Sequence, residues 1–348
     1  MTIGGIFMNR ITLGKTGLVI EKNGFGCLPI QRISEQDAVK LLHKAYDGGI
    51  NFFDTARAYS DSEQKVGAAF SAMRDKIVLA TKTGAQTAEE FWKDLETSLR
   101  TLKTDYIDLY QFHNPAFCPK PGGEDGLYDA ALEAKKQGKI RHIAITNHRL
   151  TVAHEAIDSG LYETLQFPFS YLAGEQEMEL VRKCRAQQMG FIAMKGLSGG
   201  LINNSRAACA FIAQYANVAA IWGVQRDWEL EEFLSYIGNP PAMTADIRAL
   251  IDHDRQELSG DFCRGCGYCM PCPQGIQINN CARMSQMIRR APSADWLTPE
   301  WQERMLRIES CLRCGKCMKH CPYGLKIPDL LQKNLADYKR ILAGEEKV

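Results

Sequence analysis

The cysteines of this 348-residue chain are concentrated near its C-terminus, where nine of the 13 follow residue 260. Eight of these nine form two groups, and each group has a C-x-x-C-x-x-C run with a fourth cysteine followed by proline. The groups are Cys263, Cys266, Cys269 and Cys272, and then Cys311, Cys314, Cys317 and Cys321. Three thiolates at this spacing can occupy three corners of one iron–sulfur cubane. The pattern therefore predicts two 4Fe-4S clusters and a redox role in a reducing compartment.

The fourth cysteine of each group is expected to bind the cluster of the other group. This cross-assignment gives one cluster Cys263, Cys266, Cys269 and Cys321, and gives the other Cys311, Cys314, Cys317 and Cys272. The first group has two residues, where the usual pattern has three, before its Cys-Pro, which leaves the assignment of Cys272 open to correction. Structural zinc is the alternative, although zinc sites usually use two separated C-x-x-C pairs. The ninth cysteine, Cys281, is expected to be a small buried side chain.

Charge and hydropathy narrow the classes of partner. The net charge of +1 argues against a nucleic-acid binder whose basic charge is spread over the whole molecule. The sequence contains no run of 18 or more apolar residues, so no membrane-spanning helix is expected. The first residues lack the pattern of a secretory signal, and we therefore expect a cytoplasmic location. Basic residues beside the cysteine groups could dock an acidic ferredoxin or flavodoxin, or could simply be solvated. They are Arg264, Arg313, Lys316 and Lys319.

Strand-like and helix-like segments alternate before residue 238. The strand-like segments are 24–29, 51–54, 77–82, 106–113, 140–146, 164–167, 190–195 and 219–222. Amphipathic stretches lie between them, at 35–48, 62–73, 87–102, 125–137, 150–159, 175–188 and 206–216, with a last one at 229–236. Eight such units predict an α/β fold of the (β/α)8 TIM-barrel type. A doubly wound open sheet is the alternative, but no G-x-G-x-x-G follows the first strand.

The chain is expected to have three parts. Residues 1–238 form the barrel, with a short hairpin at 9–20 before its first strand. The Asn239-Pro240-Pro241 break begins a linker with a helix, at 239–260. Residues 261–348 form a small α-rich, bacterial-ferredoxin-like domain with the two clusters.

Four polar residues, Asp54, Tyr59, Lys82 and His113, lie at or just after the ends of successive predicted strands. In a barrel these ends converge on one mouth, where active sites lie. Hydride addition to a carbonyl places negative charge on oxygen, which must then receive a proton. Lys82 is expected to lower the pKa of Tyr59, Asp54 to hold Lys82, and His113 to orient the substrate oxygen. The four together predict carbonyl reduction, whereas each alone has an ordinary structural explanation.

These residues lie within sequence motifs by which the chain resembles the aldo-keto reductase family over about residues 9–236. The motifs are LGKTGL, GFG, GGINFFDTARAYSDSE, ATKTG, YIDLYQFHN and GKIRHIAITNH. The resemblance implies that Asp54, Tyr59, Lys82 and His113 are the family's catalytic tetrad, acting on a small carbonyl or alcohol. The tail, with CGYCMPCPQGI and CLRCGKCMKHCPYGLKIP, resembles the ferredoxin-fused branch of that family.

The resemblance also implies a nicotinamide cofactor, NADH or NADPH. Thr146, Asn147 and Gln166 would bind its carboxamide, and Lys195 follows the place of the family's ring-stacking aromatic, where this chain has Met194.

After the last strand, the segment GVQRDWELEEF, which begins at Gly223, replaces the family's usual nucleotide-binding segment. Glu229 stands where many NADPH-using members of the family have an arginine for the 2′-phosphate, and a carboxylate repels a phosphate. Arg226 is expected to compensate. Glu232 keeps the family's acidic residue, whereas Phe233 replaces an asparagine near the adenine.

The barrel and the cluster domain are expected to transfer electrons in different numbers. A cluster transfers one electron at a time, whereas a hydride carries two. No flavin motif is evident that would convert between them. Three hypotheses follow: an iron–sulfur oxidoreductase whose clusters relay electrons, an ordinary NAD(P)H-dependent carbonyl reductase with structural clusters, and a non-enzymatic redox sensor on a reductase scaffold. The substrate and the oligomeric state are not readable from the sequence.

Overall fold

The computed structural model describes all residues except 1, 4–5, 8–9, 259–261, 291–292 and 347–348. The chain divides into two compact units. The first, called the barrel unit below, comprises Met1–Gly196 and Cys209–Met243, and the second, the cluster unit, comprises Leu197–Ala208 and Thr244–Val348. The chain therefore leaves the barrel unit after Gly196 and returns to it at Cys209, a division that the sequence pattern gave no reason to expect.

Eight parallel strands form a closed barrel in the spatial order β10-β11-β12-β5-β6-β7-β8-β9, which confirms the predicted TIM-barrel fold. The strands are β5 (Asn23–Gly26), β6 (Phe52–Asp54), β7 (Val78–Thr83), β8 (Ile107–His113), β9 (Ile140–Thr146), β10 (Thr164–Pro168), β11 (Gly190–Met194) and β12 (Val218–Gly223). Nearly all of their residues are buried, as expected for strands with side chains in the barrel interior on one face and against helices on the other.

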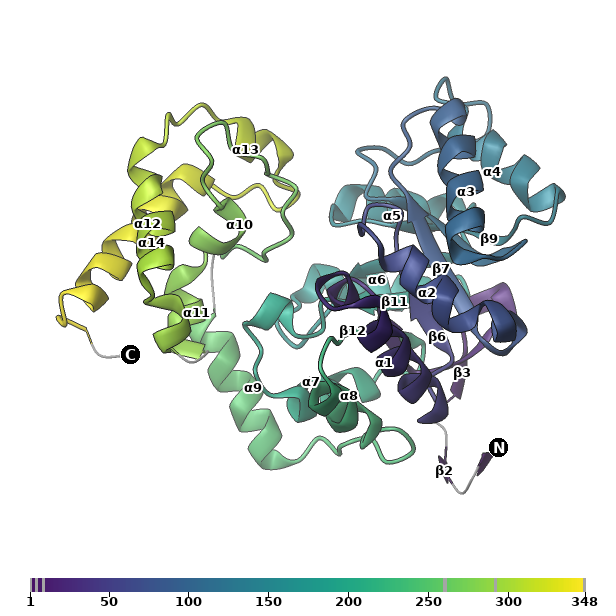
Figure 1. Ribbon diagram of the computed structural model, residues 1–348, viewed down its shortest axis with the longest axis horizontal. Helices are drawn as coiled ribbons and strands as arrows, with labels where there is room; N and C mark the ends of the chain where they lie inside the picture. Colours follow the sequence, from purple (N-terminus) through teal and green to yellow (C-terminus); the bar gives the residue numbers. More distant parts are fainter. Residues whose placement is uncertain (1, 4–5, 8–9, 259–261, 291–292, 347–348) are drawn as a thin grey trace. The chain divides into compact units, whose positions relative to one another are not determined.

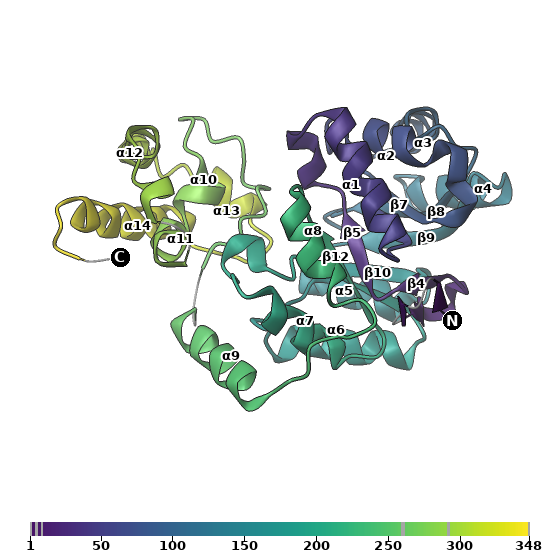
Figure 2. The ribbon, with the colours of Figure 1, turned by 60° about the horizontal axis from the view of Figure 1, so that its bottom comes forward.

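Helices surround the strands, as Figures 1 and 2 show. They are α1 (Glu35–Asp47), α2 (Ser62–Phe70), α3 (Ala88–Leu102), α4 (Leu127–Lys136), α5 (Leu150–Ser159), α6 (Glu175–Ala186), α7 (Ser205–Ala213) and α8 (Asp227–Leu234). Local sequence defines where several begin. The side chains of Ser34 and Thr87 accept hydrogen bonds from backbone N–H groups in the first turns of α1 and α3.

The predicted hairpin is present as β3 (Arg10–Thr12) paired with β4 (Val19–Glu21), and a second small pair is formed by β1 (Thr2–Ile3) and β2 (Ile6–Phe7). Leu13 and Ile20 are fully buried in a core cluster that contains the strand residues Phe52 and Ile192. The hairpin thus closes one end of the barrel. Gly14 has a φ of +55°, and a Cβ there would lie 2.2 Å from the backbone nitrogen of Gly190, so a larger residue would not fit.

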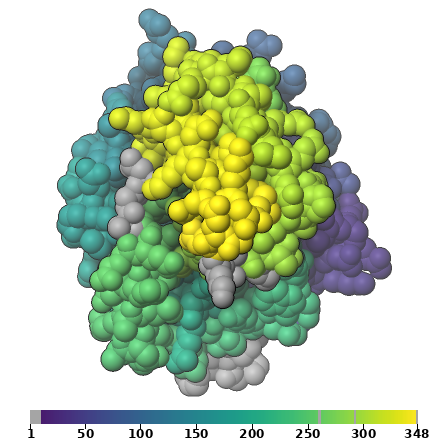
Figure 3. Space-filling model, turned by 90° about the vertical axis from the view of Figure 1, so that its left-hand side faces the viewer, coloured from purple at the N-terminus to yellow at the C-terminus, as the bar shows by residue number. Residues whose placement is uncertain are grey.

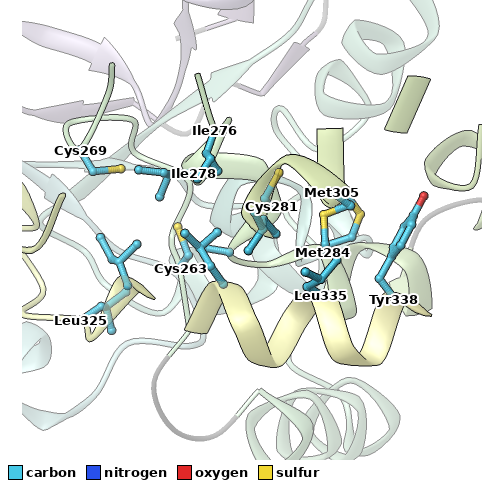
Figure 4. Packing of buried hydrophobic residues seen from close by; sticks show 14 of the residues in the cluster. Cys263, Cys269, Ile276, Ile278, Cys281, Met284, Met305, Leu325, Leu335 and Tyr338 are labelled. Atoms are coloured by element: carbon cyan, nitrogen blue, oxygen red, sulfur yellow. The ribbon is translucent and has the colours of Figure 1, made fainter. Parts of the chain in front are cut away.

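The cluster unit is built from short helices packed on one longer helix. They are α9 (Ala245–Glu257), α10 (Ile278–Cys281), α11 (Met284–Arg290), α12 (Pro299–Leu306), α13 (Lys316–His320) and α14 (Ile327–Leu342). Buried Leu331, Leu335 and Tyr338 of α14 form the core of the unit with α10, α11 and α12 (Figure 4). The last turns of α14 lie at the surface, in yellow in Figure 3. Within the described residues, no helix has the length and apolar character that crossing a membrane requires.

Candidate functional site

A buried ion pair between Asp54 and Lys82 forms the centre of the barrel's polar cluster. Asp54 ends β6, Lys82 lies on the neighbouring strand β7, and both side chains are 1% exposed. The Lys82 Nζ donates to both carboxylate oxygens, at 2.7 Å to Oδ2, and also to the backbone oxygen of Thr55 at 2.6 Å. Burial raises the pKa of Asp54, and the Lys82 ammonium opposes that shift. The pair holds the ammonium in one position at the strand ends.

Two glutamine side chains complete the surroundings of Asp54. The Nε2 of Gln111 donates to Oδ2 at 3.3 Å, and the Nε2 of Gln166 donates to Oδ1 at 3.4 Å. Gln166 was expected to contact a nicotinamide, and Gln111 was not singled out from the sequence. A signal for Gln111 exists, because it lies on β8 two residues before His113 and side chains at that spacing share a strand face. Both glutamines orient the carboxylate.

The structure brings all four tetrad residues together. The rings of Tyr59 and His113 meet edge to face with centroids 5.8 Å apart, and the Lys82 Nζ lies 5.2 Å from the centroid of the Tyr59 ring. Burial, followed by the charge of Asp54, raises the pKa of Tyr59. The expected lowering by Lys82 is therefore not found, because burial and the charge of Asp54 set the direction of the shift in the pKa. Burial, followed by the Lys82 charge, lowers the pKa of His113 to about 3, so its imidazole is neutral.

Cys27 is a further group at this cluster that the sequence analysis did not identify. It directly follows β5, is fully buried, and its backbone N–H donates to the backbone oxygen of Asp54 at 2.8 Å. Burial, followed by Asp54, raises the pKa of the Cys27 thiol. The thiol therefore remains protonated and contributes no charge to the site.

The residues expected to bind a nicotinamide carboxamide lie on adjacent strands. Gln166 of β10 is paired in register with Thr146 of β9, and the backbone N–H of Asn147 donates to the backbone oxygen of Gln166. The Asn147 Oδ1 accepts from the N–H groups of His148 and Arg149, and its Nδ2 donates to Pro115. Its amide thus keeps one N–H for a ligand.

The complementary acceptor is the Gln166 Oε1, which is buried and has no hydrogen-bond partner among the described residues. A primary carboxamide presents one acceptor oxygen and two N–H donors. The free N–H of Asn147 and the oxygen of Gln166 therefore fit such a group. The Thr146 hydroxyl faces the Met194 sulfur at 4.0 Å, and Lys195 has a positive φ of 58° just after β11.

The segment expected to bind the nucleotide runs from the exposed Gly223, the last residue of β12, into α8. The Glu229 Oε2 accepts the backbone N–H groups of Gln225 and Arg226 at 3.0 Å each, and its Oε1 lies 3.6 Å from the Arg226 guanidinium. Glu229 is thus a helix cap. Since the cap occupies N–H groups that could receive an anion and also engages Arg226, the local geometry gives no support to a 2′-phosphate site there.

Phe233 and Glu232, the other two residues of that segment that were compared with the family's nucleotide-binding residues, contact side chains of this chain. Phe233 stacks on Trp222, with ring centroids 4.7 Å apart and planes 20° apart. Glu232 accepts a hydrogen bond from the Tyr236 hydroxyl at 3.3 Å.

The cysteines of the cluster unit lie in two neighbourhoods, and none of the 13 cysteines of the chain forms a disulfide. One pocket is lined by five cysteines, namely Cys269, Cys272, Cys311, Cys314 and Cys317. In the other neighbourhood, the electrostatic partners of Cys263 include Cys266 and Cys321. Among the described residues, no three Cys, His, Asp or Glu side chains are close enough together to hold a single metal ion. The pocket brings Cys272 of the first group together with Cys311, Cys314 and Cys317 of the second, which is the arrangement that the cross-assignment requires.

The two neighbourhoods differ in exposure. Cys263 and Cys269 are buried in the core of the unit, whereas Cys314 is exposed. Leu312 and Met318, beside Cys314 in sequence, are 67% and 43% exposed, which is unusual for large apolar side chains. The ninth cysteine, Cys281, is fully buried among core side chains (Figure 4), as predicted.

Comparison with known proteins gives two matches to family models. Residues 11–214 match the aldo/keto reductase family, and residues 262–326 match a 4Fe-4S dicluster domain.

Curated relatives match the barrel part. An uncharacterized oxidoreductase, YqkF of Bacillus subtilis, is 30% identical over 209 residues, which are 56% of this chain and 67% of that protein. The L-galactose dehydrogenase of Arabidopsis thaliana is 30% identical over 213 residues, which are 55% of this chain and 66% of that protein. The chain thus spans about two thirds of the length of these relatives.

Solved structures share the fold. The holo form of aldo-keto reductase AKR11C1 from Bacillus halodurans superposes with a TM-score of 0.63 at 23% identity, covering 71% of this chain and 96% of that chain. An aldo/keto reductase from Klebsiella pneumoniae in complex with NADP and acetate gives a TM-score of 0.57 at 21% identity, covering 71% and 95%.

Proposed function

Because the chain belongs to the aldo/keto reductase family and carries a C-terminal 4Fe-4S dicluster domain, we propose that it is an iron–sulfur oxidoreductase that interconverts a carbonyl and an alcohol. The observation that carries this proposal is the buried Asp54–Lys82 pair with Tyr59 and His113 beside it. A buried charge pair is costly to maintain, and it here lies at the strand ends where barrel active sites are found.

The proposed proton chemistry follows from the protonation states of the site. Reduction of a carbonyl to an alcohol takes up two electrons and two protons. A bound nicotinamide would supply both electrons together with one proton as hydride; on the cluster route, the two reduced clusters would supply one electron each and solvent would supply that proton. Tyr59 supplies the second proton to the oxygen. Its raised pKa keeps the phenol protonated until the oxygen becomes an alkoxide, which is a stronger base than a phenolate. Neutral His113 donates an N–H to the same oxygen.

The cofactor proposal rests on two observations. Among the described residues, the buried Oε1 of Gln166 has no hydrogen-bond partner, and one N–H of the Asn147 amide remains. These two groups fit the donor and the acceptor of a nicotinamide carboxamide. For the clusters, the sets Cys263, Cys266, Cys269 and Cys321, and Cys311, Cys314, Cys317 and Cys272, are the proposed ligands. When bound, each cluster can carry one electron.

A small acidic one-electron carrier, of ferredoxin or flavodoxin type, is the proposed partner of the second cluster. The docking face comprises exposed Leu312 and Met318, with Lys316 and Lys319 around the exposed Cys314. Apolar side chains with basic neighbours beside an exposed cluster ligand suit transient docking of an acidic protein. Neither lysine forms an ion pair within the described part of the chain.

Replacement of Tyr59 by phenylalanine tests the proposed activity. The anaerobic, cluster-loaded protein is assayed with a panel of small aldehydes and ketones and with NADH or NADPH. Tyr59→Phe is expected to lower kcat about 10²–10⁴-fold, the usual contribution of a general acid. The control is Tyr128→Phe, whose hydroxyl donates to the Leu161 backbone oxygen away from the tetrad. Equal activity of both variants would contradict the proposal and favour a non-enzymatic redox sensor.

An ordinary NAD(P)H-dependent carbonyl reductase with structural clusters is the second candidate. The burial of Cys263 and Cys269 in the core of the cluster unit favours it, because clusters there would also hold the unit together. Cys266→Ser should then lower stability and leave the NAD(P)H-dependent kinetics of the folded protein unchanged.

A further inference from the structure

A buried arginine, Arg283, lies next to the first group of cysteines. The side chain stands between α10 and α11 and is 8% exposed. Its Nη1 donates to the backbone oxygen of Gly199 at 2.6 Å, and its Nε is buried with no acceptor within the described part of the chain. No carboxylate forms an ion pair with it among the described residues, although a guanidinium remains charged in proteins. A buried cation without a carboxylate needs another source of negative charge.

Two glycines form the space that the guanidinium fills. A Cβ at Gly199 would lie 2.7 Å from its Nη1, and a Cβ at Gly265 would lie 2.7 Å from its Cζ. Both glycines have a positive φ, so their backbone also disfavours other residues. Gly265 stands between Cys263 and Cys266, and the sulfurs of those two cysteines are the electrostatic partners of the guanidinium. The missing negative charge is therefore that of the proposed first cluster.

We propose that Arg283 is a positioning residue that raises the reduction potential of the cluster bound by Cys263, Cys266 and Cys269. An oxidised cubane with four thiolates carries a charge of about −2, and reduction adds one more negative charge. A fixed cation in a buried site stabilises the reduced form more than the oxidised form. The unpartnered Nε–H can add a hydrogen bond to sulfur, which shifts the potential in the same direction.

The same guanidinium holds the segment Leu197–Ala208, which follows β11 of the barrel in sequence and packs with the cluster unit. Arg283 thus connects the first group of cysteines to Leu197–Ala208 within the cluster unit. This inference rests on the proposed electron-relay function, in which the first cluster takes one electron from the second cluster or from an added one-electron reductant.

A second arginine provides a matched control. Arg290 holds the same segment, because its Nη1 donates to the backbone oxygen of Leu201 at 3.1 Å. Its charge is balanced by two carboxylates, those of Asp254 at 2.9 Å and Glu257. Arg290 therefore shares the anchoring contact with Arg283 but lacks the proximity to the cysteines.

An anaerobic redox titration followed by electron paramagnetic resonance tests the proposal on the cluster-loaded protein without substrate. Arg283→Gln is expected to lower the potential of one cluster, so that the ratio of reduced to oxidised cluster at a fixed potential falls about tenfold. For one electron this ratio corresponds to about 59 mV. The second cluster in the same sample should keep its potential. Arg290→Gln should leave both potentials unchanged.

A further variant keeps the test independent of folding differences. Arg283→Lys keeps a cation at the same position, and the first cluster's potential should then lie closer to that of the wild type than the potential of Arg283→Gln does. Unchanged potentials in Arg283→Gln, equal shifts in Arg290→Gln, or an equal shift in Arg283→Lys and Arg283→Gln would each overturn the proposal. Since no substrate is used, these results are separate from any failure of the proposed carbonyl reduction.

Discussion

The buried pair Asp54–Lys82 gives the first prediction at the scale of single residues. Asp54→Asn would leave the Lys82 ammonium buried beside a neutral amide, with both side chains 1% exposed in the parent protein. Loss of one partner of a buried pair costs about 3–5 kcal/mol. Chemical denaturation should therefore show a large loss of barrel stability.

The control for this variant is Asp227→Asn, which breaks the exposed pair with Lys44. Exposed pairs contribute little, so its unfolding midpoint should stay close to that of the wild type. Similar midpoints for the two variants would show that the Asp54–Lys82 pair is not held as described.

His113 gives a pH-dependent prediction. Its pKa is about 3 in the folded protein and about 6.5 in an unfolded chain. The unfolded state therefore binds more protons in this range, and the stability contributed by neutral His113 is lost as the pH falls from about 6.5 toward 3. Between pH 7 and pH 5, the wild type should lose up to about 2 kcal/mol more free energy of unfolding than His113→Gln. Parallel losses in the two proteins would contradict this.

Some of these residue properties followed from sequence and others did not. The tetrad could be placed because strand ends of a barrel converge, whatever the details of packing. The raised pKa of Tyr59 could not, because it depends on how completely the phenol is buried and on the nearby charge of Asp54. The capping role of Glu229 and the contact of Gln111 with Asp54 depend equally on local geometry.

At the scale of elements, the contact between α2 and α3 depends on Gly67. A Cβ at this position would lie 2.4 Å from the backbone oxygen of Thr101 and 2.8 Å from the backbone carbon of Leu102. Backbone atoms cannot move aside without shifting a helix, so Gly67→Ala should lower the free energy of unfolding by about 1–3 kcal/mol. Gly84→Ala is the control, since a Cβ there meets nothing within 4 Å and its φ is ordinary. Equal thermal midpoints would refute the packing argument.

The elements of the barrel were predictable, because hydrophobic periodicity sets strands and helices within a few residues. The assignment of Leu197–Ala208 to the cluster unit was not, because it depends on contacts with Arg283 and Arg290, some 80 residues later in sequence. The short helix α13 was also not expected. It begins after Gly315, whose φ of +74° turns the chain between two cysteines.

At the scale of the whole molecule, the proposed docking face predicts a salt-dependent reaction. The double substitution Lys316→Glu and Lys319→Glu should slow cluster reduction by an acidic reduced ferredoxin at least about tenfold at low ionic strength, because it reverses the steering charge. The difference should shrink as salt screens the charges.

Lys333→Glu on α14 is the control, with the same change of side chain at another exposed position. Stopped-flow absorbance measures the rate. If Lys333→Glu slows cluster reduction as much, per substituted lysine, as the double substitution does, the carrier does not use the proposed docking face.

The central claim is that the clusters supply electrons to carbonyl reduction at the tetrad. Its most direct test is an anaerobic single turnover of the cluster-loaded protein with a panel of small carbonyl compounds. Oxidised and pre-reduced clusters are compared, each with and without NADH or NADPH, and product and cluster absorbance are followed together. We predict that product forms as the clusters are re-oxidised, and that both signals are lost in Tyr59→Phe. Turnover that depends on the nicotinamide alone and is the same for oxidised and reduced clusters would contradict the claim.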